Sequence, residues 1–177
     1  PMLKNYAGLM VYDGALADGS SSKAISQGAI SAMFKKTEDA DVFFGLAAHV
    51  QDRDNYYAAR FSGDSALELY KVADGKPQLI ASLPSIKRYR YPDEWKLTLG
   101  VRGDLITAVL KDEKGIELAR VDGKDDTFKG GWLGLNCTTF AAAKSVQIDS
   151  IDSYTPKLAP DQIAKRIAEL SSKSPTY

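Results

Sequence analysis

The sequence predicts an all-β fold in which two antiparallel sheets stack as a sandwich. Apolar and polar side chains alternate with a period of two along most of the chain, which is typical of strands that bury one face. Clusters of glycine and aspartate interrupt the alternation at intervals of about eight to twelve residues, as they do in antiparallel sandwiches. No helical pattern lies between the predicted strands, which argues against a parallel sheet built from βαβ units.

The first two predicted strands span residues 29–36 and 41–50. In the second strand Phe44, Leu46 and Ala48 share one face and are expected to fill the space between the sheets. The remaining predicted strands are, in order, 55–62, 66–73, 76–83, 94–102, 105–111, 116–121, 132–137 and 144–153.

Turn sequences justify the boundaries between these strands. SGDS separates the predicted strands 55–62 and 66–73, and ADGK separates 66–73 from 76–83; both are built from residues that tolerate tight backbone geometry. Gly103 and Asp104 form a two-residue hairpin signal between 94–102 and 105–111. The count of about ten strands suits two stacked sheets of five to six strands each.

The end of the chain has a different pattern. Residues 1–155 are predicted to form the sandwich domain, and residues 156–177 a short helical tail. Apolar side chains in the tail recur at spacings of three and four, at Ile163, Ile167 and Leu170. We expect this narrow stripe to pack on the sandwich itself or on a partner domain or subunit.

Composition excludes several classes of protein. The chain has 177 residues, of which 23 are basic and 23 acidic, and 44% are hydrophobic. A zero net charge gives no support to a role in binding nucleic acid or anionic membranes. The longest apolar stretch is about half of what a membrane span needs. A soluble, compact protein without an internal disulfide is therefore expected.

Common catalytic and metal-binding motifs are missing. His49 is the sole histidine and Cys137 the sole cysteine, so neither a zinc site nor a complete Ser-His-Asp unit has its usual ligands or partners. We interpret His49, at the end of an apolar strand, as a structural residue. Calcium stays open as a cofactor because the oxygen-rich segments 52–55 and 122–126 could supply carboxylates, although neither fits the EF-hand pattern.

Several segments resemble the concanavalin A-like lectin/glucanase superfamily, in particular its laminin-G-like domains. GAISAMFK, DVFFGLAAHVQDRDNYYAARFSGDSALELYKVADGK, EWKLTLGVRGDLITAVL and GGWLGLNCTTFAAAKSVQIDSI follow the order of that domain's strands over residues 23–153. The resemblance implies a jelly-roll sandwich that binds sugars on its concave sheet, in an extracellular or periplasmic setting. No secretory signal opens this chain.

The acidic motif E-x-D-x-x-E of glycosidases in this superfamily is absent. The leading hypothesis is therefore a non-catalytic carbohydrate-binding domain for an oligosaccharide or polysaccharide. The second hypothesis is a glycoside hydrolase or polysaccharide lyase that uses carboxylates from separate strands, such as Glu68 and Asp149. The third is a structural sandwich that makes protein contacts.

Alternation also selects the side chains that point away from the core of the ligand-binding sheet. Sugar recognition needs an aromatic ring and planar polar groups that bond hydroxyls. The candidate ligand-binding residues, which supply both, are Tyr56, Arg60, Glu68, Tyr70, Trp132 and Asn136. Two alternatives stay open, since Arg60 and Glu68 could form a cross-strand ion pair and Trp132 could belong to the core. His49 is expected on the outward side as well, in phase with Ala47.

Overall fold

The computed structural model describes residues 9–11, 25–35, 43–62, 66–84, 94–137 and 143–150. Within these ranges the chain forms eleven strands. In chain order they are β1 (Leu9–Val11), β2 (Gly28–Lys35), β3 (Phe43–Asp52), β4 (Asn55–Ser62), β5 (Leu67–Ala73), β6 (Lys76–Leu83), β7 (Glu94–Arg102), β8 (Leu105–Asp112), β9 (Glu117–Lys124), β10 (Trp132–Asn136) and β11 (Ala143–Ser150).

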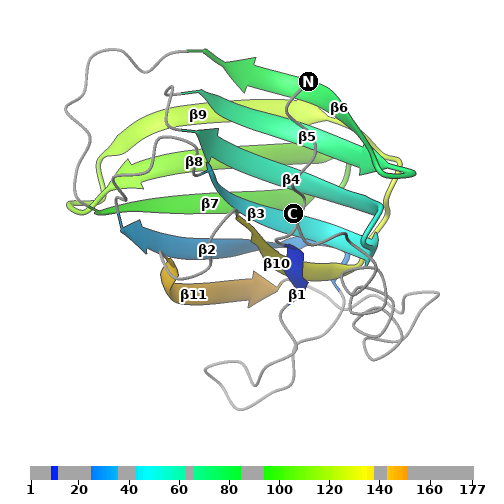
Figure 1. Cartoon of the computed structure of the whole chain (residues 1–177), viewed down its shortest axis with the longest axis horizontal. Helices are drawn as coiled ribbons and strands as arrows, with labels where there is room; N and C mark the ends of the chain where they lie inside the picture. The colour runs from blue at the N-terminus through cyan, green and yellow to red at the C-terminus, as the bar shows by residue number, and fades with distance from the viewer. Residues whose placement is uncertain are drawn as a thin grey trace, which may run out of the picture.

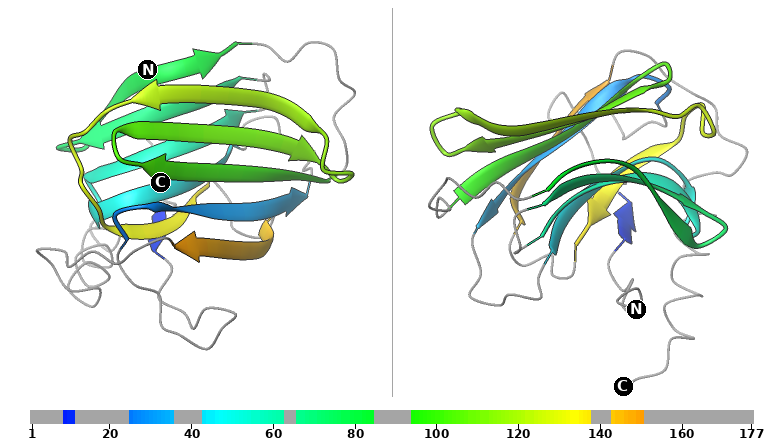
Figure 2. Two further views of the ribbon diagram at one scale, coloured as in Figure 1. Left: turned by 180° about the vertical axis from the view of Figure 1, so that it is seen from behind. Right: turned by 90° about the horizontal axis from the view of Figure 1, so that it is seen from above.

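The strands form two sheets that lie face to face (Figure 1). One has six strands in the order β1-β10-β3-β4-β5-β6, and the other has five in the order β11-β2-β7-β8-β9. Every neighbouring pair is antiparallel. The right-hand view of Figure 2 shows that the six-stranded sheet is curved, with its concave side turned away from the five-stranded sheet. We call this concave side the outer face.

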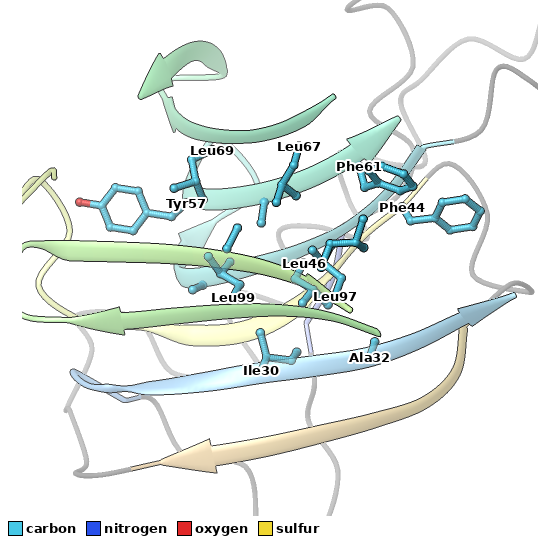
Figure 3. Packing of buried hydrophobic residues seen from close by; sticks show 14 of the residues in the cluster. Ile30, Ala32, Phe44, Leu46, Tyr57, Phe61, Leu67, Leu69, Leu97 and Leu99 are labelled. Carbon is cyan, nitrogen blue, oxygen red and sulfur yellow. The ribbon is translucent and has the colours of Figure 1, made fainter. Parts of the chain in front are cut away.

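The main core fills the space between the sheets. Inward side chains at alternate positions of β2, β3, β4, β5 and β7 meet there, as Figure 3 shows for Ile30, Leu46, Leu69 and Leu97. One end of the core is aromatic: the ring of Phe44 lies 5.2 Å from that of Phe34 and 5.0 Å from that of Trp95. The core thus fixes which side of each strand faces outward.

A crossover segment, residues 125–131, connects β9 in the five-stranded sheet to β10 in the six-stranded sheet. The hydroxyl of Tyr57 holds it by donating to Asp125 Oδ1 at 2.7 Å and by accepting from the backbone N–H of Phe128 at 3.0 Å. Lys71 Nζ donates to Asp125 Oδ2 at 2.7 Å. The path of the chain into β10 is therefore tied to β4 and β5.

The predicted sandwich of two antiparallel sheets is confirmed, and each of the predicted strands is present with ends that differ by a few residues. The short strand β1 was not predicted, because three residues are too few to show alternation. The predicted C-terminal helix lies outside the described residues. Among the described residues, no helix is long and apolar enough to cross a membrane.

Candidate functional site

The six predicted ligand-binding residues lie on the outer face of the six-stranded sheet. They come from three strands: Tyr56 and Arg60 from β4, Glu68 and Tyr70 from β5, and Trp132 and Asn136 from β10. The residues that alternate with them, such as Ala59, Leu69 and Leu135, belong to the core between the sheets. The strand order β10-β3-β4-β5 brings the six residues onto one surface.

Arg60 and Asn136 meet across an intervening strand. Arg60 Nε donates to Asn136 Oδ1 at 2.8 Å, although β3 lies between β4 and β10. The residue of β3 that pairs with Arg60 is Gly45. A Cβ atom at Gly45 would lie 2.4 Å from the backbone oxygen of Asn136 and 2.7 Å from that of Ala59. The absence of a side chain at this position therefore opens the path that Arg60 takes.

Tyr70 connects Arg60 to Glu68. The guanidinium carbon of Arg60 lies 5.0 Å from the centroid of the Tyr70 ring, within the range of a cation–π contact. The Tyr70 hydroxyl donates to Glu68 Oε2 at 2.8 Å. Arg60 and Glu68 are opposite each other in the register, but the ion pairs between described residues do not include one that joins them. The cross-strand ion pair considered from the sequence is thus replaced by a link through Tyr70.

An apolar patch adjoins this polar group on the outer face. Its buried members are Ala47, Val50, Tyr56, Ala58, Val72 and Trp132. Trp132 is packed among apolar side chains, as the core alternative held, but in this patch and outside the core between the sheets. Its buried Nε1–H group has no acceptor among the described residues, so the indole is a donor that a ligand could satisfy.

The outer face is less open than alternation predicts. The exposed fraction is 2% for Tyr56, 7% for Arg60, 3% for Trp132 and 1% for Asn136, whereas alternation alone would turn these side chains towards water. Glu68 and Tyr70 are half-buried. Next to Tyr70, its register partner Leu79 on the edge strand β6 is 55% exposed. The accessible part of the face is therefore the side formed by Glu68, Tyr70 and Leu79.

His49 is structural, as its position at the end of an apolar strand indicates, but it does not point the way that the sequence predicts. Its backbone has a positive φ of 50°, and the β3–β4 register shifts between Ala48 and Asp52. This bulge breaks the alternation, so Val50 takes the outward position. The imidazole instead lies 5.8 Å from the ring of Tyr57, a core residue.

The carboxylates considered for catalysis lie on strands of different sheets, and those considered for metal binding form no cluster among the described residues. Glu68 is on β5, whereas Asp149 is on β11 of the other sheet, opposite Ala29. Asp52 Oδ1 accepts from the backbone N–H of Asp54 at 2.8 Å, a hydrogen bond that is typical of Asx turns. Among the described residues there is no group of three or more His, Cys, Asp or Glu side chains that could hold a metal ion.

The carboxyl of Asp125, in the crossover segment, has a strongly lowered pKa. Burial alone would raise the pKa of its carboxyl, but hydrogen bonds from Lys71, Tyr57 and Thr127 hold that pKa well below its usual range. Burial also raises the pKa of the Tyr57 phenol far above its usual value. These two groups fix the crossover segment and stand apart from the six outer-face residues.

Comparisons with known proteins give the fold. No family model matches the sequence, and no curated protein matches it either. Among solved structures, the carbohydrate-binding module CBM66 from Bacillus subtilis has a TM-score of 0.55 at 18% identity, over 85% of this chain and 97% of that chain. Sheep galectin-11 in complex with glycerol has a TM-score of 0.51 at 7% identity, over 71% and 92%. The GH43 protein BlXynB from Bacillus licheniformis has a TM-score of 0.52 at 7% identity, over 71% of this chain and 28% of its own. The chain therefore shares the two-sheet antiparallel β-sandwich of these three structures.

Proposed function

We propose that this chain is a non-catalytic carbohydrate-binding domain of the concanavalin A-like lectin/glucanase superfamily, and that it binds an oligosaccharide or polysaccharide on the concave outer face. The observation that carries the proposal is the linked group of Arg60, Tyr70 and Glu68, which presents a cation, an aromatic ring and a carboxylate side by side. Sugar hydroxyls both donate and accept, so vicinal hydroxyls can bond to such a group. The name of the structural neighbour CBM66 supports the same class of function.

The exposure of the face suggests where a sugar enters. Glu68 and Tyr70 are half-buried and Leu79 is exposed, so we infer that a glycan first contacts this side. The single positive charge of Arg60 and the single negative charge of Glu68 balance within the group. We therefore expect a neutral glycan to bind better than a uronic or sialic acid, whose carboxylate would approach Glu68.

The sandwich fold alone does not distinguish sugar binding from protein contacts. The distinguishing feature is the polar chain from Asn136 through Arg60 and Tyr70 to Glu68. The hydrolase or lyase hypothesis has no comparable support, because Glu68 and Asp149 lie on strands of opposite sheets. We further propose that residues 156–177 form a tail separate from the sandwich domain, and that the protein acts outside the cytoplasm.

A glycan array followed by calorimetry tests the proposed function. We expect wild-type protein to bind neutral glycans, and Glu68→Gln to bind about ten-fold more weakly, because a charged acceptor is replaced by a neutral one. Glu117→Gln is the matched control, since Glu117 is exposed on β9 of the other sheet, and it should bind like wild type. Failure of wild type to bind any glycan would overturn the function, and equal affinity of Glu68→Gln and wild type would overturn the site.

A further inference from the structure

His49 makes an unusual pair of contacts within the fold. Its side chain is buried, with 1% exposed, and both ring nitrogens lie at hydrogen-bond distance from backbone oxygens. Nδ1 is 2.8 Å from the oxygen of Phe128, in the crossover segment. Nε2 is 3.1 Å from the oxygen of Ser26, just before β2. The imidazole thus bridges two segments that are distant in the sequence.

The chemistry of these partners restricts the protonation state of the ring. A backbone carbonyl oxygen only accepts hydrogen bonds, and a neutral imidazole has a single N–H to donate. Both contacts can be hydrogen bonds at the same time only if both nitrogens carry protons, as they do in imidazolium. In the neutral ring, one nitrogen lone pair would face a carbonyl lone pair, and that link would be lost.

We propose that His49 carries a proton in the folded protein and acts as a pH-dependent clamp between the segment that precedes β2 and the crossover segment. Loss of the proton would leave one of the two links. This inference does not depend on sugar binding, since it concerns the joint between the sheets.

Burial opposes a positive charge on the ring, so the two carbonyl contacts and the nearby groups have to offset that cost. An ionisable group that packs against the imidazole is Tyr57 of β4, whose ring centroid lies 5.8 Å from that of His49. Burial raises the pKa of the Tyr57 phenol, so it stays neutral. Its hydroxyl is bonded to Asp125, whose pKa lies below its usual range and which Lys71 of β5 neutralises in part. An ionised carboxylate is thus held one side chain away from His49.

The clamp is connected to the outer face through the chain itself. The side-chain amide of Gln51 donates to the backbone oxygens of His49 and Gly130. Gly131 exchanges backbone hydrogen bonds with Ile25, at 2.8 and 2.9 Å, and a Cβ atom at Gly131 would lie 2.6 Å from the backbone carbon of His49. Trp132 follows directly in β10. Loosening of the clamp would therefore loosen the segment that leads into Trp132.

NMR of protein labelled with ¹⁵N in the histidine ring tests the protonation state directly. Because His49 is the sole histidine, its two ring nitrogens give the sole imidazole signals. We expect both nitrogens of the folded protein to be protonated at pH 7, above the value of about 6.5 at which an exposed histidine titrates. An unprotonated ring nitrogen in the folded protein at pH 7 would overturn the proposal.

Denaturant unfolding between pH 5.5 and 8.5 tests the consequence for stability, with His49→Asn as the comparison. Asparagine tolerates a positive φ and keeps an uncharged donor. Since the folded chain holds a proton that the unfolded chain has released, lowering the pH from 8.5 towards about 6.5 should stabilise wild type relative to His49→Asn. The relative unfolding constant should change by up to about ten-fold per pH unit and level off at lower pH. Parallel curves would overturn the proposal, and if the variant does not fold, the NMR measurement on wild type decides.

Discussion

Arg60 lies over the ring of Tyr70, with its guanidinium carbon 5.0 Å from the ring centroid, while its Nε–H is bonded to Asn136. One side chain from β4 therefore connects β5 on one side with β10 on the other, two strands away. Arg60 and Asn136 are both buried. Removing the Arg60 side chain would therefore leave Asn136 Oδ1 without this donor in a place that water does not reach.

Replacing Arg60 with alanine should weaken glycan affinity by about 1–3 kcal/mol and lower the free energy of unfolding by a similar amount. The physical reason is that Asn136 Oδ1 loses its donor in a buried site. Calorimetric titration and urea unfolding measure the two effects. Arg120→Ala is the matched control, because Arg120 pairs with Glu117 in an exposed ion pair of β9, and it should change neither quantity measurably. An Arg60→Ala protein as stable as the control would contradict the prediction.

Tyr70 has two roles that two substitutions separate. Tyr70→Phe keeps the ring beneath Arg60 but removes the hydroxyl that donates to Glu68. Tyr70→Ala removes both contacts. We expect Tyr70→Ala to weaken glycan affinity by about 1–3 kcal/mol and Tyr70→Phe by about 1 kcal/mol, as measured by titration with the best glycan from the array. Equal losses for the two variants would show that the ring contributes nothing.

Period-two alternation was sufficient to predict which sides of β4 and β5 face the core. Once Leu67 and Leu69 are assigned to the core, Glu68 and Tyr70 must lie on the other side. Alternation could not predict that Tyr56 and Trp132 would be buried on that other side, because it gives the direction of a side chain and not what covers it. Nor could it predict Leu79 beside Tyr70, since that depends on the register of β6 after a bulge.

Two further features depend on long-range geometry that no local pattern contains. Arg60 and Asn136 are 76 residues apart, and their contact requires that β10 pair with β3 and that Gly45 lie between them. From Leu46 to Asp52, β3 has no glycine or proline to mark the bulge at His49, so uninterrupted alternation predicts the wrong face. In both cases the arrangement is set by strand order and by the crossover segment.

Gly45→Ala should be strongly destabilising. The new Cβ would meet the backbone oxygens of Asn136 and Ala59, which cannot move without displacing β10 or β4, so we expect a loss of about 3 kcal/mol in urea unfolding. Gly100→Ala on β7 is the matched control. Its Cβ would find no atom nearer than 3.9 Å, and alanine is favoured over glycine in strands, so a gain of about 0.5 kcal/mol is expected. Similar effects at the two glycines would refute the close approach of the Asn136 and Ala59 backbones to Gly45.

Asp125→Asn should destabilise the protein in a pH-dependent way. The asparagine amide has one oxygen and one NH2 group, so it cannot accept through separate oxygens from both Lys71 Nζ and the Tyr57 hydroxyl. At pH 7 we expect this loss to lower the free energy of unfolding by about 1–3 kcal/mol. Because the pKa of Asp125 is lowered in the folded protein, its contribution is fully present above the unfolded value of about 3.9 and is lost as the pH falls further. The difference between wild type and variant should therefore be constant from pH 7 to about 5 and shrink below about 4.

Thermal or urea unfolding from pH 2.5 to 7 measures that difference, with Asp104→Asn as the control. Asp104 meets Lys124 at 3.8 Å with both side chains more than half exposed, so its substitution should change the free energy of unfolding by less than about 0.5 kcal/mol at every pH. A difference between wild type and Asp125→Asn that persists undiminished at pH 2.5 would mean that the Asp125 carboxylate is not the group that Lys71 and Tyr57 stabilise. In that case the crossover segment would have to be held by its backbone contacts with Ile25.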